Sequence, residues 1–253
     1  MKVIVIANQK GGVGKTTTSL ALGDGLRLKG YSVLSIDSDS QRSMSKQFMA
    51  KEDDQETLYD VLVGNCTIDE AIQHTERGDI VAGDKLLRNI DAILNGMKRH
   101  LHLKHALENM EAEYDYVVID TPPALNTINL NNFTACDEVI IPFNYEMMSL
   151  EGLVEFAETI RDVKSISNPN IRVAGILPVM VMSRTNVTKQ LASQLDPFNK
   201  LLDTKTFNAS IRRSTVQSEA HLLRESIFEH ATGSAVATDY LDFVEEYLES
   251  EEK

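Results

Sequence analysis

The chain has 253 residues and a formal net charge of −13, from 25 Lys and Arg against 38 Asp and Glu. Hydrophobic residues make up 42% and charged residues 25%, which excludes disordered and collagen-like chains and is typical of a soluble globular protein. A single α/β domain often has this length, so we expect residues 1–253 to form one domain. The acidic balance argues against a general nucleic-acid coat, so any contact with a polyanion must be local.

Neither end of the chain nor its cysteines suggest a secreted or membrane protein. The start, MKVIVIANQKGG, lacks the apolar run and cleavage site of a signal peptide, and no segment has the ~20 apolar residues of a membrane helix. Cys66 and Cys136 lie far apart in the chain and lack the spacing of a metal site. We therefore expect a cytoplasmic location.

Short β-rich runs alternate with longer helical patterns, which predicts βαβ units around a mostly parallel, twisted sheet with helices on both faces. The expected strands are 3–7, 33–37, 80–82, 116–120, 139–142 and 173–178. Most are continuously apolar, as strands covered on both faces should be. Helices are expected at 17–28, at 86–110 with a break near Gly96, at 149–164 with Ser149 as cap, and at about 235–250, docked on the body.

The segment KGGVGKTT lies between the first strand and the first helix. Glycines allow a tight turn that directs successive N–H groups at phosphate oxygens, and the helix N-terminus adds positive potential. In such a P-loop, Lys15 reaches the β- and γ-phosphates and Thr16 offers its hydroxyl to Mg²⁺. The usual pattern begins with a glycine where this chain has Gln9. Here Gly11 and Gly12 follow a second lysine, Lys10.

This altered loop resembles the deviant Walker A motif of the ParA/MinD family of P-loop ATPases. The segment IDSDSQ (36–41) is similar to that family's Asp-x-Asp-Pro-Gln switch, with Ser40 at the usual proline position, and YDYVVIDTPP (114–123) is similar to its Walker B strand. Three further segments resemble ParA and Soj-type partition proteins in particular: LYDVLVG (58–64), IPFNYEMMSLEG (141–152) and IRRSTVQSEA (211–220).

Three carboxylates are the expected catalytic and metal-binding groups. Asp120 ends an apolar strand, so its carboxylate should emerge beside the phosphate loop and hold Mg²⁺ together with Thr16. Asp37 and Asp39 are two positions apart, so both side chains should point to one side of an extended segment. The resemblance implies that Asp39 positions or activates the attacking water and that Asp37 supports the metal shell.

The resemblance also implies how ATP is bound and how its hydrolysis is used. Lys10 would cross a dimer interface to the phosphates of the partner's ATP, so ATP would stabilise a homodimer and hydrolysis would release it. The base is expected near Pro178, Phe207 and Asn208. The remaining nucleotide contacts are expected from the loop itself, at Lys10, Gly11, Gly12, Val13, Gly14, Lys15, Thr16 and Thr17.

Partition ATPases of this kind bind DNA without sequence preference in the ATP state, and a ParB-like adaptor stimulates their weak hydrolysis. The residues expected to contact DNA phosphates are Arg184, Lys189, Arg212, Arg213 and Arg224. The resemblance thus implies segregation of plasmid or chromosomal DNA on the nucleoid. Alternatives are a related ATPase that positions a non-DNA cargo, a MinD-like membrane positioner, which the acidic end EEYLESEEK disfavours, and a kinase or ligase that shares this P-loop.

Overall fold

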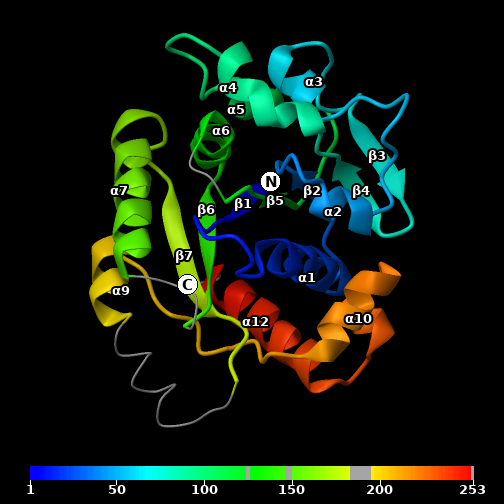
Figure 1. Cartoon of the computed structure of the whole chain (residues 1–253), viewed down its shortest axis with the longest axis vertical. Helices are drawn as coiled ribbons and strands as arrows, with labels where there is room; N and C mark the ends of the chain where they lie inside the picture. The colour runs from blue at the N-terminus through cyan, green and yellow to red at the C-terminus, as the bar shows by residue number, and fades with distance from the viewer. Residues whose placement is uncertain (124–125, 146–149, 183–194, 252–253) are drawn as a thin grey trace.

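A seven-stranded sheet forms the centre of the protein (Figure 1). The computed structural model describes residues 1–123, 126–145, 150–182 and 195–251. The strand order is β3-β4-β2-β5-β1-β6-β7, and all neighbouring strands are parallel except β3 and β4, which confirms the mostly parallel α/β fold. The strands are β1 (Lys2–Ile6), β2 (Val33–Asp37), β3 (Ile72–Thr75), β4 (Gly78–Val81), β5 (Tyr116–Asp120), β6 (Glu138–Phe143) and β7 (Arg172–Pro178).

Two hydrophobic clusters, one on each face, cover the sheet. One face packs against α3 (Leu58–Val63), α5 (His102–Glu108), α6 (Thr127–Ala135), α7 (Leu150–Ile166) and α9 (Asp196–Leu202). The other packs against α1 (Lys15–Leu28), α10 (Thr215–Leu223), α11 (Ile227–His230) and α12 (Ala235–Glu251). Strand residues alternate between the two clusters, with Val3 and Val5 in the first and Ile4 and Ile6 in the second. This explains why the strands read as continuous apolar runs.

Most expected helices are present, with shifted ends. The region 86–110 divides into η1 (Lys85–Asn89), α4 (Ile90–Ile93) and α5, and Gly96 lies in the break with a φ of 88°. The terminal helix is α12, and the helix after β6 is α7; the expected cap Ser149 lies outside the described residues.

Strand β3 and several short helices were not expected from the sequence. The segment of β3, Ile-Gln-His-Thr, is short and mostly polar, and it becomes a strand by pairing antiparallel with β4 at the edge of the sheet. The helix α2 (Ser43–Gln47) is likewise too short for a period of hydrophobic residues to reveal it.

The strand register brings the expected site residues together. Asp37 lies opposite Asp120 in the pairing of β2 with β5, and Ile6 lies opposite Asp120 in the pairing of β1 with β5. All three residues end their strands, and the phosphate loop follows Ile6 directly. The carboxyl edge of the sheet therefore holds the loop and both carboxylates, at the place where parallel sheets bind ligands.

Candidate active site

The phosphate loop connects β1 to α1 through two left-handed glycines. Gly12 has a φ of 75° and Gly14 a φ of 82°, a conformation that glycine adopts without steric cost. Gly14 is also the residue from which α1 begins. The Lys15 side chain is buried, and its Nζ donates to the carbonyl oxygen of Lys10 at 3.1 Å. The backbone thus has the shape that the sequence predicts for a phosphate-binding loop.

Asp120 is fully buried and accepts two side-chain hydrogen bonds from α1. The Thr16 hydroxyl donates to Oδ2 at 2.7 Å, and the Ser19 hydroxyl donates to Oδ1 at 3.1 Å. The two residues expected to hold Mg²⁺, Thr16 and Asp120, are therefore direct neighbours. Ser19 has no counterpart in the sequence prediction, although its position one turn after Lys15 on the predicted helix was a usable signal.

Asp37 is also fully buried, and it organises the chain that follows β2. Its Oδ2 accepts hydrogen bonds from the backbone N–H of Ser45 at 2.8 Å and from the Ser45 hydroxyl at 2.7 Å. Its Oδ1 accepts from the backbone N–H of Asp39 at 3.1 Å. Asp37 thus supports the geometry of the segment that carries Asp39.

Burial gives this site unusual electrostatics. Desolvation, joined by the charge of Asp37, raises the pKa of Asp120 to about 7. Burial likewise raises the pKa of Asp37 to about 6, against the hydrogen bonds from Ser45. Burial lowers the pKa of Lys15, while the charges of Asp120 and Asp39 act to raise it. Asp39 therefore lies near enough to Lys15 for its charge to act there, although it is two residues beyond the strand end.

The donor set fits Mg²⁺. This ion prefers oxygen ligands and keeps several waters, with one or two carboxylates and substrate phosphates completing its shell. Two desolvated carboxylates and the Thr16 hydroxyl at one strand edge offer such oxygens. Among the described residues there is no group of three or more His, Cys, Asp or Glu that could hold a metal ion.

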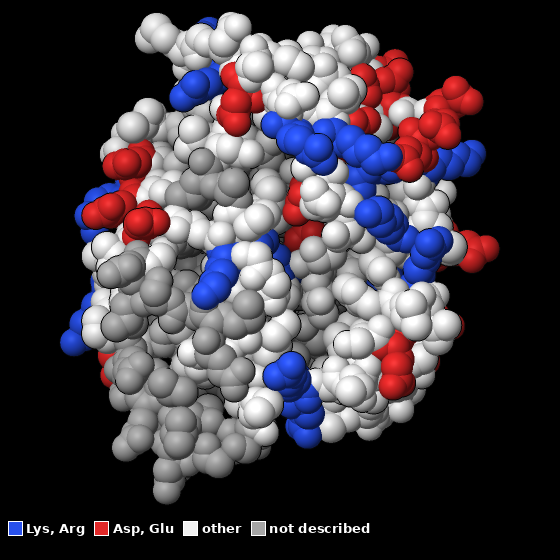
Figure 2. Space-filling view, viewed as in Figure 1, with Lys and Arg blue, Asp and Glu red and all other residues white. Residues whose placement is uncertain are grey.

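Lys10 lies at the exposed side of the loop, unlike Lys15. Its backbone N–H donates to the side chain of Asn8 at 3.0 Å, and a side chain at the next position, Gly11, would meet no atom within 4 Å. On the face shown in Figure 2, Lys and Arg side chains lie beside the start of α1 and around α2, while acidic side chains gather over α7. Lys10 itself is exposed, so an approaching molecule can reach it.

A cavity beside the phosphate loop lies near one of the residues expected to contact the base. A cavity of about 270 Å³ next to the phosphate loop is lined by Gly14 and Thr17 and, across from them, by Val179, Met180 and 211–214. Pro178 is buried at the end of β7, directly before this lining. Of the residues that the sequence singled out for the base, Pro178 thus lies next to this cavity, and Phe207 and Asn208 lie outside its lining.

Phe207 and Asn208 have structural contacts instead. The Phe207 ring is buried against Gly175, where an added Cβ would come within 2.3 Å of it, and packs edge-on against Phe243. The backbone N–H and side-chain amide of Asn208 donate to Glu246 of α12 at 2.9 and 3.1 Å. These two residues therefore join β7 to α12, a role that depends on contacts far along the chain.

The expected DNA-binding arginines that the structure describes, Arg212, Arg213 and Arg224, lie in different surroundings. Arg212 makes a two-pronged ion pair with the buried Asp239, at 2.6 and 2.7 Å, so its charge is neutralised within the protein. Arg213 is exposed and lines the 270 Å³ cavity, whereas Arg224 lines a separate cavity with Arg27 and Arg77. The other two candidates, Arg184 and Lys189, lie outside the described residues.

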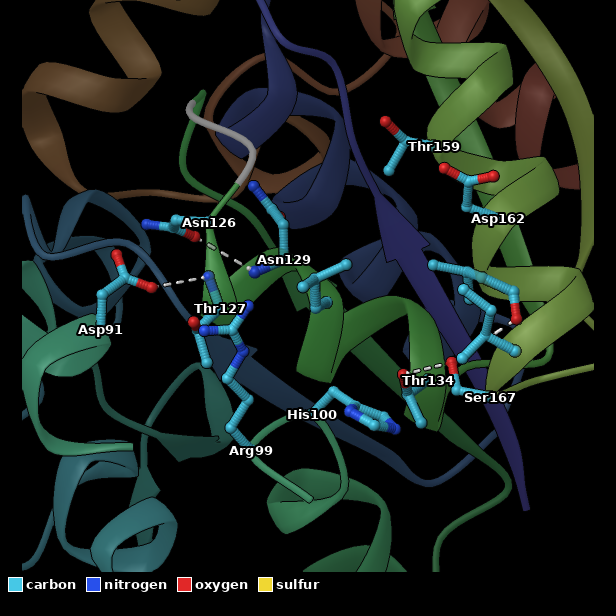
Figure 3. Close-up of a pocket in the computed structure, with 13 residues that line it drawn as sticks. Asp91, Arg99, His100, Asn126, Thr127, Asn129, Thr134, Thr159, Asp162 and Ser167 are labelled. Carbon is cyan, nitrogen blue, oxygen red and sulfur yellow. Dashed lines mark hydrogen bonds between the residues drawn. The ribbon is translucent and has the colours of Figure 1, made fainter. Parts of the chain in front are cut away.

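A larger cavity, of about 600 Å³, lies between α6, α7 and the segment before α5 (Figure 3). Its walls carry Arg99 and His100 on one side and Thr159 and Asp162 of α7 on the other. The phosphate loop does not line it. The helix α6 links the two regions, because Asn132 of the same helix donates to the Ser38 hydroxyl at 2.8 Å, and Ser38 in turn donates to the carbonyl of Asp120 at 2.6 Å.

Comparison with known proteins places this site in a family. A family model described as an AAA domain matches residues 1–173. The chain is 34% identical over 249 residues to the sporulation initiation inhibitor protein Soj of Bacillus subtilis, covering 97% of each chain. It is 34% identical over 257 residues to the chromosome partitioning protein ParA of Caulobacter vibrioides, covering 99% of this chain and 95% of that protein.

Solved structures agree with the fold. A putative plasmid partition protein of Borrelia burgdorferi bound to AMPPNP is 26% identical, with a TM-score of 0.81 and 98% of each chain covered. Cobyrinic acid a,c-diamide synthase of Mycobacterium smegmatis with bound ADP and magnesium is 28% identical, with a TM-score of 0.80 and 97% and 93% covered. Together with the loop and the carboxylates described above, these similarities show that the chain belongs to the Soj/ParA family of partition ATPases, which has the ParA/MinD type of P-loop fold.

Proposed function

We propose that this protein is an ATP-dependent dimerisation switch that hydrolyses ATP and binds DNA in its ATP state. One observation carries the proposal: Lys15, Thr16, Asp37 and Asp120 converge at the carboxyl edge of β1, β2 and β5, and Lys10 is exposed beside them. Family membership supports ATP hydrolysis, and the related structures named above contain AMPPNP or ADP with magnesium.

Each residue has a distinct part in the proposed reaction. Lys15 and the N–H groups of the loop bind the phosphates, and Thr16 and Asp120 hold Mg²⁺ with support from Asp37. Bound Mg²⁺ neutralises the charge that develops on the phosphates during hydrolysis. Asp39 orients the attacking water. Its charge acts at Lys15, and unlike Asp37 and Asp120 its side chain is partly exposed. The 270 Å³ cavity beside Gly14 receives the base.

In the proposed switch, Lys10 acts on the ATP of a second copy of the protein. Its own loop already supplies Lys15 to the phosphates, and Lys10 is exposed on the open side of the loop. In the proposed dimer each Lys10 reaches the triphosphate of the partner subunit and stabilises negative charge there. Loss of the γ-phosphate removes that contact, so hydrolysis favours dissociation.

The test of the switch uses Asp39→Ala, which should bind ATP while its hydrolysis rate falls by about 100-fold or more, because the water loses its orienting carboxylate. In light scattering this variant should have the mass of a dimer with ATP and of a monomer with ADP. Adding Lys10→Ala should return it to a monomer with ATP. Wild-type turnover in Asp39→Ala, or a monomer under every condition, would contradict the proposal.

We propose that the ATP-bound dimer binds DNA and that a ParB-like adaptor stimulates its ATP hydrolysis. The end of α12 is acidic, whereas a helix that binds a membrane surface needs basic residues on its polar face, and this disfavours the MinD-like alternative. Among the described residues no helix is long and apolar enough to cross a membrane. The relatives favour partition over the ligase alternative, since Soj and the chromosome partitioning protein ParA are both 34% identical over nearly the whole chain. A non-DNA cargo remains the second candidate, because the adaptor would choose the cargo.

Duplex DNA of random sequence should bind Asp39→Ala only in the presence of ATP, and binding should weaken steeply as salt rises, because phosphate contacts release counterions. Arg213→Ala should weaken binding to all sequences alike, since Arg213 is exposed while Arg212 is paired with Asp239. Fluorescence anisotropy measures both effects. Failure of the ATP-loaded variant to bind at low salt would exclude DNA as the readout.

A further inference from the structure

Arg42 is a buried arginine at the edge of the candidate active site, and the proposed function gives it no role. It lies between Asp39 and α2, and its side chain is only 6% exposed. Its backbone has a φ of 58°, in the left-handed region that residues other than glycine rarely occupy. A residue stays in such a conformation only when the surrounding contacts enforce it.

The guanidinium of Arg42 joins three separate parts of the chain. Its Nε donates to the carbonyl of Gly83, after β4, at 2.8 Å. Its Nη2 donates to the carbonyl of Lys51 at 3.3 Å, and its Nη1 pairs with Glu52 at 2.9 Å. Glu52 also pairs with Lys85. The acceptors are thus two backbone carbonyls and one carboxylate, spread over the segments on either side of α3 and β3.

The backbone of Arg42 is tied to the residue proposed to orient water. Its N–H donates to the carbonyl of Asp39 at 2.9 Å, and its own carbonyl accepts from Lys46 of α2 at 3.0 Å. We call residues 37–45 the switch segment, because it carries Asp37 and Asp39 and ends at Ser45. Arg42 therefore connects the middle of the switch segment to Gly83.

Gly83 lies directly against that segment. A Cβ at Gly83 would be 2.9 Å from the carbonyl oxygens of both Asp37 and Asp39. The Gly83 N–H donates to the Ser45 hydroxyl at 2.9 Å, and that hydroxyl donates to Asp37 Oδ2 at 2.7 Å. Hydrogen bonds therefore connect Asp37 to Ser45, Ser45 to Gly83, Gly83 to Arg42 and Arg42 to Asp39. The bond from the Asp39 N–H to Asp37 Oδ1 closes this ring.

We propose that Arg42 is a positioning residue that holds the switch segment against Gly83 and so fixes the place of the Asp39 carboxylate. This inference rests on the proposed ATPase function, and it adds a residue that acts through Asp39 rather than on the substrate. The guanidinium suits the task because its planar fork supplies several donors in fixed directions. A lysine at the same position carries the charge but cannot reach both carbonyls and Glu52 in that geometry.

Two substitutions distinguish the role of the Arg42 guanidinium from the role of its left-handed backbone. Arg42→Lys keeps the charge and most of the side-chain volume. Arg42→Gly relaxes the left-handed backbone and removes every side-chain contact. If Arg42 served only the turn, glycine would serve as well or better. We expect both variants to lower kcat tenfold or more with KM for ATP changed less than twofold, because Asp39 is misplaced while the phosphate loop is intact.

Arg77→Lys is the matched control. The Arg77 side chain is 10% exposed and binds Asp24 through Nη2 at 2.7 Å, so the control also removes a buried guanidinium contact. Arg77 directly precedes β4, whereas Gly83 follows the other end of that strand. We expect Arg77→Lys to lower the melting temperature about as much as Arg42→Lys and to leave kcat within twofold of the wild type.

Amide hydrogen exchange without nucleotide provides a readout that does not depend on activity. The N–H groups of Arg42, Ser45 and Gly83 should exchange at least tenfold faster in Arg42→Lys, and at the wild-type rate in Arg77→Lys. Wild-type kcat in both Arg42 variants, equal losses in Arg42→Lys and Arg77→Lys, or unchanged exchange at these amides would overturn the inference. A wild-type protein without ATPase activity would instead overturn the proposed function, and the exchange data alone would then decide whether Arg42 holds the segment.

Discussion

At the scale of single residues, the site contains two carboxyl groups whose burial disfavours their charged form. Asp37 and Asp120 are both fully buried at adjacent strand ends, and they accept hydrogen bonds from hydroxyl and backbone donors of α1 and of the segment after β2. Because the pKa of Asp120 rises to about 7 and that of Asp37 to about 6, the protein without metal holds a proton on Asp120 for part of the time at neutral pH and protonates both groups more fully below pH 6. Binding of a divalent cation must therefore displace protons.

This arrangement predicts a pH dependence of stability. The pKa of Asp120 rises from an ordinary value of 3.8 to about 7 in the folded protein, so the native state binds more protons than the unfolded state between these values. The free energy of unfolding should therefore fall by up to a few kcal/mol as the pH rises from about 4 to about 7. Urea unfolding without magnesium at pH 5 and pH 7.5 measures the change.

Asp120→Asn is the control, because its side chain does not titrate and it keeps an acceptor for Thr16. The variant should lose most of the Asp120 contribution and become more stable than the wild type at pH 7.5. Added Mg²⁺ should stabilise the wild type more at pH 7.5 than at pH 5, where protons compete with the ion. A wild-type pH profile parallel to that of Asp120→Asn would show that Asp120 titrates normally.

At the scale of elements, α1 connects the phosphate loop to the docked terminal helix. Its buried residues Ala21, Leu22 and Leu26 pack in the same cluster as Val244 of α12. Two glycines lie within this continuous helix, and they differ in their surroundings. A Cβ at Gly25 would come within 2.7 Å of Val244 Cγ2 of α12, whereas a Cβ at Gly23 would meet its nearest atom, on Arg27, at 3.5 Å. Gly25 therefore permits the close approach of the two helices.

The pair of glycines gives a matched prediction. Gly25→Ala should destabilise the protein by about 1–3 kcal/mol, because the added methyl group overpacks the contact with Val244. Gly23→Ala should be neutral or stabilising by up to about 1 kcal/mol, because alanine favours the helix and finds room. Thermal unfolding of the two variants decides the matter, and equal effects at both positions would mean that α12 does not pack as closely as described.

At the scale of the whole molecule, α12 covers one face of the sheet, and its last turn reaches the amino ends of the strands, opposite the active site. The hydroxyl of Tyr247, a residue with no exposed surface, donates to the buried Glu138 at 2.6 Å. Lys2 of β1 and Arg172 of β7 both pair with Glu138 and with Glu251 of α12. One network of charges thus joins the amino ends of three strands to the last turn of the chain.

Tyr247→Phe should destabilise the folded protein by about 1–3 kcal/mol, because Glu138 stays buried and loses a donor. The surface ion pair between Lys29 and Glu245 provides the comparison, because Glu245 lies on α12 like Tyr247. Glu245→Gln should cost no more than about 1 kcal/mol, since both partners of that pair are solvent-exposed. If Tyr247→Phe were as mild as Glu245→Gln in chemical unfolding, the Glu138 network would contribute little to holding α12.

The amino-acid sequence by itself determined the local features of this protein. The apolar runs predicted six of the seven strands, and the glycines before Lys15 predicted the loop between β1 and α1. Asp120 at the end of a strand predicted a carboxylate beside that loop, and the hydrogen bond from the Thr16 hydroxyl to Asp120 shows that it lies there. These features depend on residues that are close in the chain, where backbone sterics and hydrophobic period act.

Contacts between distant segments were decided only by the tertiary structure. The sequence did not reveal that Phe207 packs on Gly175, that Asp239 neutralises Arg212, or that Arg42 reaches Gly83. Each depends on which segments the strand order brings together, and burial then changes what a side chain can do. Charge, hydrogen bonding and desolvation act through space, so the residue types were visible in the chain, but their partners and pKa values followed from the packing of the sheet and its helices.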